Sequence, residues 1–185
     1  MDTYDAIATK LDVREFAQRH VADGTKAKIL EAARLTGSSM NSQHWRFILV
    51  SDPGNLKMLA QDSTTGSWVK EADFAVIVNI DPKVPGSVID AGRAAQDMQL
   101  AAWNEGVASG VFTGVKLKET RKDFGIPEGL SSVIVVGFGY PRRKLAGRKR
   151  REPLSAIAFL ERFGDPLPGQ ILLTAHQRPC PSVNL

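Results

Sequence analysis

The sequence predicts an α+β protein in which a sheet is flanked by helices. Short apolar runs that are typical of strands alternate along the chain with longer segments of helical character. The run from Phe74 to Ile80 is continuous and mainly apolar, as in a strand that is covered on both faces. Residues 88–105 form the longest helical segment, and their many small side chains predict a central helix that neighbours approach from more than one side.

The predicted elements follow one another in the order α-α-β-α-β-α-β-α-β. A short helix over 3–11 precedes a second helix, which begins at Asp23 as N-cap and ends at the helix breaker Gly37. Asp52 and Pro53 have the pattern of an N-cap followed by a first-turn proline. The later predicted helices cover residues 53–61, 88–105 and 116–124. The predicted strands cover residues 45–50, 74–80, 107–112 and 133–138.

Length and composition indicate one folded domain. Of the residues, 43% are hydrophobic and 24% are charged, which is the balance of an ordinary globular domain. A chain of 185 residues can bury one core well and is short for two independent cores. We expect this domain to cover residues 1–163. Four prolines and no clear periodicity predict that residues 164–185 form an extended C-terminal arm that packs on a partner subunit.

The net charge of +4 comes from one segment. Seven of the ten residues from Arg142 to Arg151 are basic, and the rest of the chain is slightly acidic. Such a run suits an anionic partner, which leaves nucleic acid open as an alternative to a phosphorylated ligand. The run contains no aromatic residue for base stacking, so we expect no nucleic-acid partner.

Several kinds of site have no support in the sequence. One cysteine, Cys180, and three scattered histidines give no metal-ligand spacing, so no metal site is expected. The chain has neither a signal-peptide pattern nor an apolar run of about 20 residues, and we expect a cytoplasmic protein without a membrane partner. Nucleotide-binding glycine motifs and nucleophile motifs are also missing. The reactive atom of an enzyme of this kind would belong to a cofactor.

Three polar clusters suit a polyhydroxylated ligand that carries a phosphate. The first is the cation pair Lys10 and Arg14, and the second is the Ser/Asn/Gln-rich loop 38–43 that leads into Trp45. The third is Lys149-x-Arg151, whose alternation places both cations on one side of an extended segment and Arg150 on the other. Arginine and lysine bind phosphate, and amides bind hydroxyls and ring edges.

With these motifs the chain resembles the nitroreductase family of flavin mononucleotide (FMN) enzymes. The family pattern Arg-Arg-Ser-x-Arg-x-Phe corresponds to residues 10–16, and Pro-Ser-x-x-Asn-x-Gln-Pro-Trp-x-Phe corresponds to residues 37–47. The pattern Gly-Tyr-Pro is present at 139–141, and Lys-x-Arg-x-Pro-Leu at 149–154. The resemblance covers residues 8–155 and implies a central, mostly antiparallel sheet in a nitroreductase-like, FMN-dependent fold.

The resemblance also implies a function and a site. It implies a homodimeric NAD(P)H-dependent flavin oxidoreductase that reduces a small organic acceptor by a ping-pong scheme, with the flavin N5 atom and no side chain carrying the hydride. The phosphate would be held by cations from the first and last motifs, Lys10, Arg14, Lys149 and Arg151. The 38–43 loop would meet the ribityl chain and the isoalloxazine edge of the flavin, and the backbone of residues 112–114 would approach its ring. The implied FMN-binding residues are Lys10, Asp12, Arg14, Ser38, Ser39, Asn41, Gln43, Phe112, Thr113, Gly114, Lys149 and Arg151.

Five positions depart from the family pattern. Lys10 replaces an arginine, Leu11 replaces a second basic residue, and Asp12 replaces a serine beside the expected phosphate. His44 and Asp73 each stand where the family has proline. A relative that binds flavin without reducing anything with it, or that consumes the flavin, is the alternative within the same family. The sequence leaves the acceptor and the choice between NADH and NADPH open.

Overall fold

The computed structural model describes residues 2–145 and 149–176, which belong to two compact units. The larger unit is residues 10–144, and the described parts of 1–9 and 145–185 make up the smaller unit. The predicted boundary at residue 163 therefore lies within the smaller unit. In the described part of the chain, no helix is long and apolar enough to cross a membrane.

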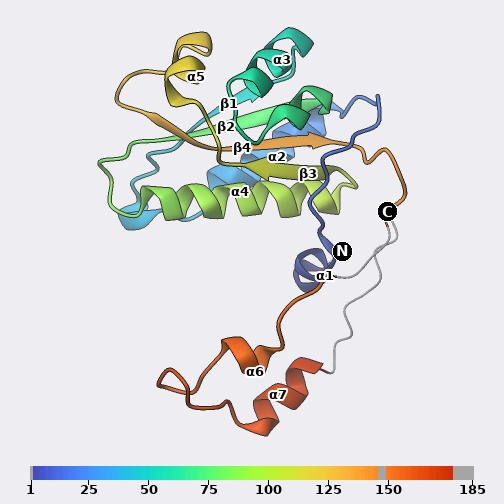
Figure 1. The fold of residues 1–185 in the computed structure, drawn as a ribbon, viewed down its shortest axis with the longest axis vertical. Helices are drawn as coiled ribbons and strands as arrows, with labels where there is room; N and C mark the ends of the chain where they lie inside the picture. Colours follow the sequence, from blue (N-terminus) through green and yellow to red (C-terminus); the bar gives the residue numbers. More distant parts are fainter. Residues whose placement is uncertain (1, 146–148, 177–185) are drawn as a thin grey trace. The chain divides into compact units, whose positions relative to one another are not determined.

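The larger unit is built on a four-stranded antiparallel sheet (Figure 1). Its spatial order is β1-β2-β4-β3, so β2 and β4 are the central strands. Every residue of β2 is buried, which confirms the strand predicted to be covered on both faces. The strands are β1 (Arg46–Val50), β2 (Phe74–Ile80), β3 (Ala108–Phe112) and β4 (Ser131–Gly139).

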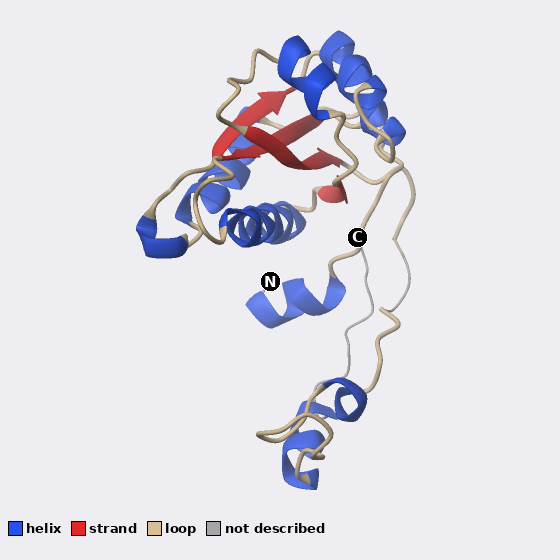
Figure 2. Ribbon diagram, turned by 60° about the vertical axis from the view of Figure 1, so that its left-hand side comes forward, coloured by secondary structure: helices blue, strands red, loops and turns tan. Residues whose placement is uncertain are grey.

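Helices cover both faces of this sheet (Figures 1 and 2). The helices α2 (Asp23–Leu35) and α4 (Ser87–Asn104) pack together on one face, and α3 (Pro53–Gln61) and α5 (Leu117–Asp123) lie on the other. Small side chains of α4 let the helix sit close to the sheet, as predicted for a central helix. The buried α4 residues that contribute to the core are Ala91, Ala94, Ala95, Met98 and Ala102.

Helix capping agrees with the sequence at one predicted site and not at the other. The Asp52 side chain accepts the Asn55 N–H at 2.9 Å, so the predicted N-cap of α3 is confirmed. Asp23 is instead the first residue of α2, and Ala22 is the N-cap, without a side-chain hydrogen bond. The prediction of Asp23 as cap is therefore wrong, because the chain turns into the helix one residue earlier.

The smaller unit contains three helices in its described residues: α1 (Thr3–Thr9), α6 (Leu154–Ile157) and α7 (Gly169–His176). In the segment that connects α6 and α7, the ring centroids of Phe159 and Phe163 lie 4.6 Å apart. The expectation of an extended arm is wrong for residues 169–176, which form a helix directly after the last described proline, Pro168. Cys180 and the prolines beside it lie outside the described residues.

Candidate functional site

The segment before α2 lies alongside β3. Val13 donates its backbone N–H to the Ser109 carbonyl at 2.8 Å, and Asp12 forms a parallel bridge with the same residue. The next β3 residue is Gly110, where a Cβ would lie 2.5 Å from the Val13 carbonyl oxygen and 2.8 Å from the Trp68 ring. Any larger residue would push the two segments apart. Gly110 therefore sets the position of Arg14 beside β3.

Arg14 and Phe112 meet the same indole ring. The Arg14 guanidinium carbon lies 5.9 Å from the Trp68 ring centroid, within the range of a cation–π contact. The Phe112 ring meets Trp68 edge to face, with the centroids 5.9 Å apart. The Trp68 indole N–H is buried and has no hydrogen-bond partner among the described residues. Two residues predicted to bind flavin thus lie around an unused buried donor, which fits a polar ligand at this place.

The backbone after β3 is open at Thr113, which is exposed. Gly114 accepts the Thr64 N–H at 2.8 Å, and a Cβ at Gly114 would collide with the hydroxyls of Thr64 and Thr65. A glycine is therefore required where the 64–65 turn crosses the end of β3. Thr113 is thus exposed and Gly114 partly buried, whereas Phe112 is 4% exposed, and the approach of this backbone to a ring stays a prediction.

The loop from Ser38 to Gln43 is strained. It contains the short 3₁₀ helix η1 (Ser39–Asn41), and its residues Met40, Asn41 and Gln43 have φ angles of 51°, 53° and 48°. The left-handed conformation costs a side-chain-bearing residue roughly 1–2 kcal/mol. Glu161 is the one other such residue that the structure describes. Backbone strain concentrated in this way is typical of functional sites.

Local hydrogen bonds connect three of the four predicted polar residues of this loop. The Ser38 hydroxyl oxygen accepts the Gln43 N–H at 3.0 Å, and the Gln43 amide donates to the Asn41 side-chain oxygen at 3.3 Å. Asn41 and Gln43 are exposed, while Ser38 and Ser39 are partly buried. The loop offers hydroxyl and amide groups at the surface, which suits a hydroxylated ligand.

Comparisons with known proteins show the family of the chain. Residues 7–81 and 60–140 match the model of the nitroreductase family. The chain belongs to the nitroreductase family. It is 35% identical over 146 residues to an Archaeoglobus fulgidus protein named "Putative NADH dehydrogenase/NAD(P)H nitroreductase", with 74% of this chain and 83% of that protein covered. Membership of the family makes the chain an oxidoreductase.

Solved structures show the same fold. A Bacteroides thetaiotaomicron structure of a protein with that same name superposes with a TM-score of 0.79 at 25% identity, covering 84% of this chain and 95% of that one. An FMN-dependent nitroreductase of Clostridium difficile superposes with a TM-score of 0.79 at 23% identity, covering 87% and 100%. The predicted α+β, nitroreductase-like fold is confirmed.

The structure pairs two of the residues that depart from the family pattern. Lys10 is 8% exposed, and its ammonium lies 2.5 Å from the Asp12 carboxylate, which also accepts from the Gln99 amide at 3.3 Å. Asp12 thus neutralises a buried lysine, as burial of a charge requires. The carboxylate that the sequence places beside the phosphate therefore has a cation of its own.

A third departure, His44, is paired with a residue that sequence reasoning missed. The His44 side chain is 3% exposed, and its Nε2 lies 3.2 Å from the Asp90 carboxylate, which also accepts the Ser39 N–H at 2.9 Å. Burial raises the pKa of Asp90, but the Ser39 N–H, His44 and Arg93 together hold it below its ordinary value. Asp90 can be recognised in the sequence as an acidic residue of a predicted helix, but no sequence pattern indicates that it contacts Ser39, which is 51 residues away.

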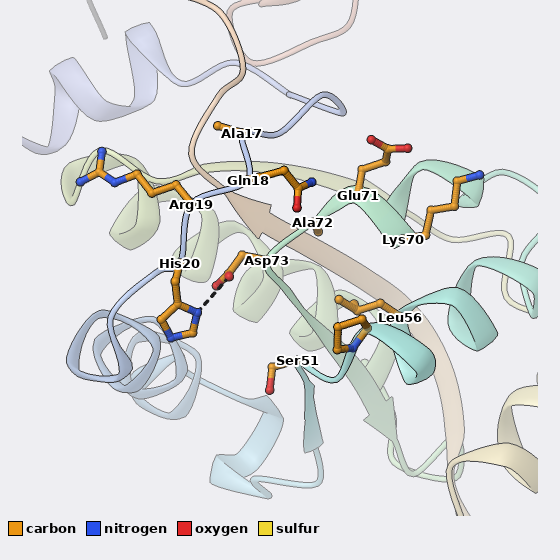
Figure 3. Close-up of a pocket in the computed structure, with 11 residues that line it drawn as sticks. Ala17, Gln18, Arg19, His20, Ser51, Leu56, Lys70, Glu71, Ala72 and Asp73 are labelled. Atoms are coloured by element: carbon orange, nitrogen blue, oxygen red, sulfur yellow. Dashed lines mark hydrogen bonds and ion pairs between the residues drawn. The ribbon is translucent and has the colours of Figure 1, made fainter.

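Another departure, Asp73, joins a buried ion pair beside a cavity of about 350 Å³. Its carboxylate accepts the Val21 N–H and lies 3.5 Å from the Lys26 ammonium, whose side chain is 8% exposed. Figure 3 shows the exposed His20 ring beside the same carboxylate, with Nδ1 3.1 Å from Oδ1. The lining residues that the structure describes include none of those predicted to bind flavin.

We expect Asp73→Ala to lower the free energy of unfolding by about 3 kcal/mol, because the buried Lys26 ammonium then keeps only the exposed Asp23 carboxylate, 3.8 Å away. Chemical denaturation of the purified variant measures the change. His20→Ala removes only an exposed contact with the same carboxylate and should cost less than about 1 kcal/mol. Equal losses in the two variants would contradict a buried Lys26–Asp73 pair.

The cations after β4 divide between the two units. Arg142 lies 3.1 Å from Glu71, and Arg143 lies 3.3 Å from Glu15, so two of the seven basic residues form ion pairs within the larger unit. Lys149 donates to the Ile7 carbonyl within the smaller unit, where Arg151 is exposed. Whether these two residues share a phosphate with Arg14 stays a prediction.

Proposed function

We propose that this nitroreductase-family chain binds FMN and passes reducing equivalents from NAD(P)H to a small organic acceptor, such as a nitroaromatic compound or a quinone. The observation that carries the proposal is the strained loop Ser38–Gln43, which lies at the family's flavin motif and presents Asn41 and Gln43 to the surface. The names of the relatives, an NAD(P)H nitroreductase and an FMN-dependent nitroreductase, support the two cofactors.

The residues present fit a flavin, and each has a part in holding it. Arg14 is exposed and would bind the phosphate, and the part proposed for Lys149 and Arg151 in phosphate binding rests on the family motif alone. Ser38, Ser39, Asn41 and Gln43 would bind the ribityl hydroxyls and the ring edge, and the backbone of residues 112–114 would border the ring. The ion pair between Lys10 and Asp12 would hold the segment that carries Arg14 in place. Bound flavin would supply the hydride chemistry, in alternating half-reactions with NAD(P)H and the acceptor.

Colour and its response to reductant test the proposal. The purified protein should be yellow, should bleach when NADH or NADPH is added without oxygen, and should recover its colour when a nitroaromatic compound or a quinone is added. A protein that binds FMN stoichiometrically but never bleaches would be the non-reductive relative. A colourless protein that does not take up added FMN would refute the proposal.

The proposal includes a cytoplasmic homodimer. Four exposed apolar residues surround the 38–43 loop: Leu35 at the end of α2, Met40 in the loop, and Val88 and Ile89 at the start of α4. The hydrogen bond between Ser39 and Asp90 ties these stretches together. A second copy of the chain that covers this face would bury them and would lie beside the loop. This arrangement supports a flavin site to which both chains contribute.

We expect Ile89→Glu to convert the dimer into a monomer and to weaken FMN binding at the same time, because dimerisation and binding at a shared site are linked. Sedimentation and flavin titration at one protein concentration measure both effects. Asn55→Glu adds the same charge to α3, on the other face of the sheet, and should change neither. A monomeric Ile89→Glu protein that keeps full affinity for FMN would contradict a shared site.

A further inference from the structure

Asp90 connects the strained loop to the rest of the fold. It lies in the first turn of α4 and is 3% exposed. Its Oδ2 atom accepts the Ser39 N–H at 2.9 Å and lies 3.2 Å from the His44 Nε2. We propose that Asp90 is a positioning residue, which holds the Ser38–Gln43 loop in the conformation that receives the flavin. The inference rests on the proposed FMN-binding function and adds to it a residue with no direct contact to the flavin.

The placement of the two contacts carries the inference. Ser39 comes directly before the strained stretch 40–43, and His44 comes directly after it. One carboxylate oxygen therefore fixes both ends of the segment that contains the three left-handed residues. Strained backbone persists only where the surrounding structure over-determines it. The other hydrogen bonds described for the loop lie within it, except one that the Arg46 side chain of β1 donates to the Gln43 carbonyl at 3.1 Å, so Asp90 supplies the connection to α4.

An ionised carboxylate suits this role better than a neutral group. Two donors meet the same oxygen, and an ionised oxygen accepts two hydrogen bonds that are stronger than neutral ones. The first turn of α4 favours a negative charge through the helix dipole. Arg93, one turn further along α4, lies 3.5 Å from the other oxygen and adds a third favourable contact.

A second carboxylate on α4 provides a matched control. Asp97 accepts a hydrogen bond from the Thr36 hydroxyl at 2.6 Å and so holds the end of α2, two residues before the loop begins. Asp97→Asn removes the same charge from the same helix and leaves both loop contacts intact. An effect that comes from general loosening of this region would appear in both variants, whereas an effect on the loop would appear only in Asp90→Asn.

The test is titration of the purified proteins with FMN and with riboflavin, which lacks the phosphate. The loop would bind the ribityl chain and the ring edge, which both ligands have. Asp90→Asn should therefore raise the dissociation constants of FMN and riboflavin to a similar degree, by about tenfold or more. Asp97→Asn should stay within about twofold of the unaltered protein for both. His44→Phe keeps an aromatic ring beside Trp45 but loses the contact with Asp90, and it should also lower the affinity for both FMN and riboflavin.

Amide hydrogen exchange of the flavin-free proteins gives a readout that does not depend on the ligand. Peptides that cover residues 38–44 should exchange faster in Asp90→Asn, while β2 and β4 should exchange as before. Unchanged exchange in the loop, or unchanged affinity for both flavins in Asp90→Asn, would overturn the inference while leaving the proposed function intact. Failure of the unaltered protein to bind either flavin would refute the proposed function and, with it, the role of Asp90.

Discussion

Replacing Arg14 by glutamate should abolish retention of FMN without unfolding the chain. The guanidinium is exposed beside β3, and its described contact is with the Trp68 ring, so the fold does not depend on it. Loss of one charge-assisted hydrogen bond to the phosphate costs about 1.5–3 kcal/mol, and repulsion by the new carboxylate adds to that loss. The dissociation constant should therefore rise by about 100-fold or more. Flavin absorbance after gel filtration and a direct titration with FMN measure the effect.

Arg19→Glu is the matched control for this variant. Arg19 comes from the same segment before α2, and its guanidinium carbon lies 3.8 Å from the Tyr140 ring centroid. Arg19→Glu therefore makes the same change of charge next to an aromatic ring, at a residue that has no proposed contact with the flavin. We expect near-normal FMN binding in Arg19→Glu. Equal losses in the two variants would mean that net charge, and not a contact at Arg14, governs binding.

Much of the fold could be predicted from the sequence because its signals are local. Apolar runs predicted all four strands, and β2 is buried along its whole length. The small residues of α4 predicted a helix that packs closely, and Asp52-Pro53 predicted the start of α3. The predicted N-cap of α2 was wrong by one residue. Helix α7 was missed because four prolines and no clear periodicity in residues 164–185 suggested an extended chain.

The candidate site was predictable where its residues are close in the sequence. Residues 38–43 form one loop, as the motif indicated. The partners of that loop were not predictable, because Ser39 and Asp90 are 51 residues apart and no spacing rule joins them. Trp68 was missed for the same reason, since its contacts with Arg14 and Phe112 depend on how two distant segments cross β3.

The departures from the family pattern have a common physical explanation. Asp12 pairs with Lys10, His44 with Asp90, and Asp73 with Lys26, and each pair includes at least one side chain that is nearly buried. A charge that is buried needs a partner. Substitutions that look unfavourable one at a time are thus halves of pairs, and the pairs can be recognised only in the fold.

The basic run supplies the second prediction with a large effect. If Lys149 and Arg151 bind the flavin phosphate, the double change Lys149→Ala/Arg151→Ala should weaken FMN binding by about 100-fold or more, because two charge-assisted contacts of about 1.5–3 kcal/mol each are lost. Binding of riboflavin should change far less, since it has no phosphate. Titrations of the same protein with the two flavins measure the difference, which contrasts with the parallel losses expected for Asp90→Asn.

Lys144→Ala/Arg150→Ala is the control that decides between a phosphate site and a diffuse basic surface. It removes one lysine and one arginine from the same run, and both side chains are exposed. A specific phosphate site predicts near-normal FMN binding in this variant, because alternation directs Arg150 away from Lys149 and Arg151. Equal loss in both double variants would place the phosphate elsewhere. DNA titrations at two salt concentrations test the remaining alternative, since tight binding of DNA at physiological salt by a colourless protein would favour nucleic acid as the partner of this run.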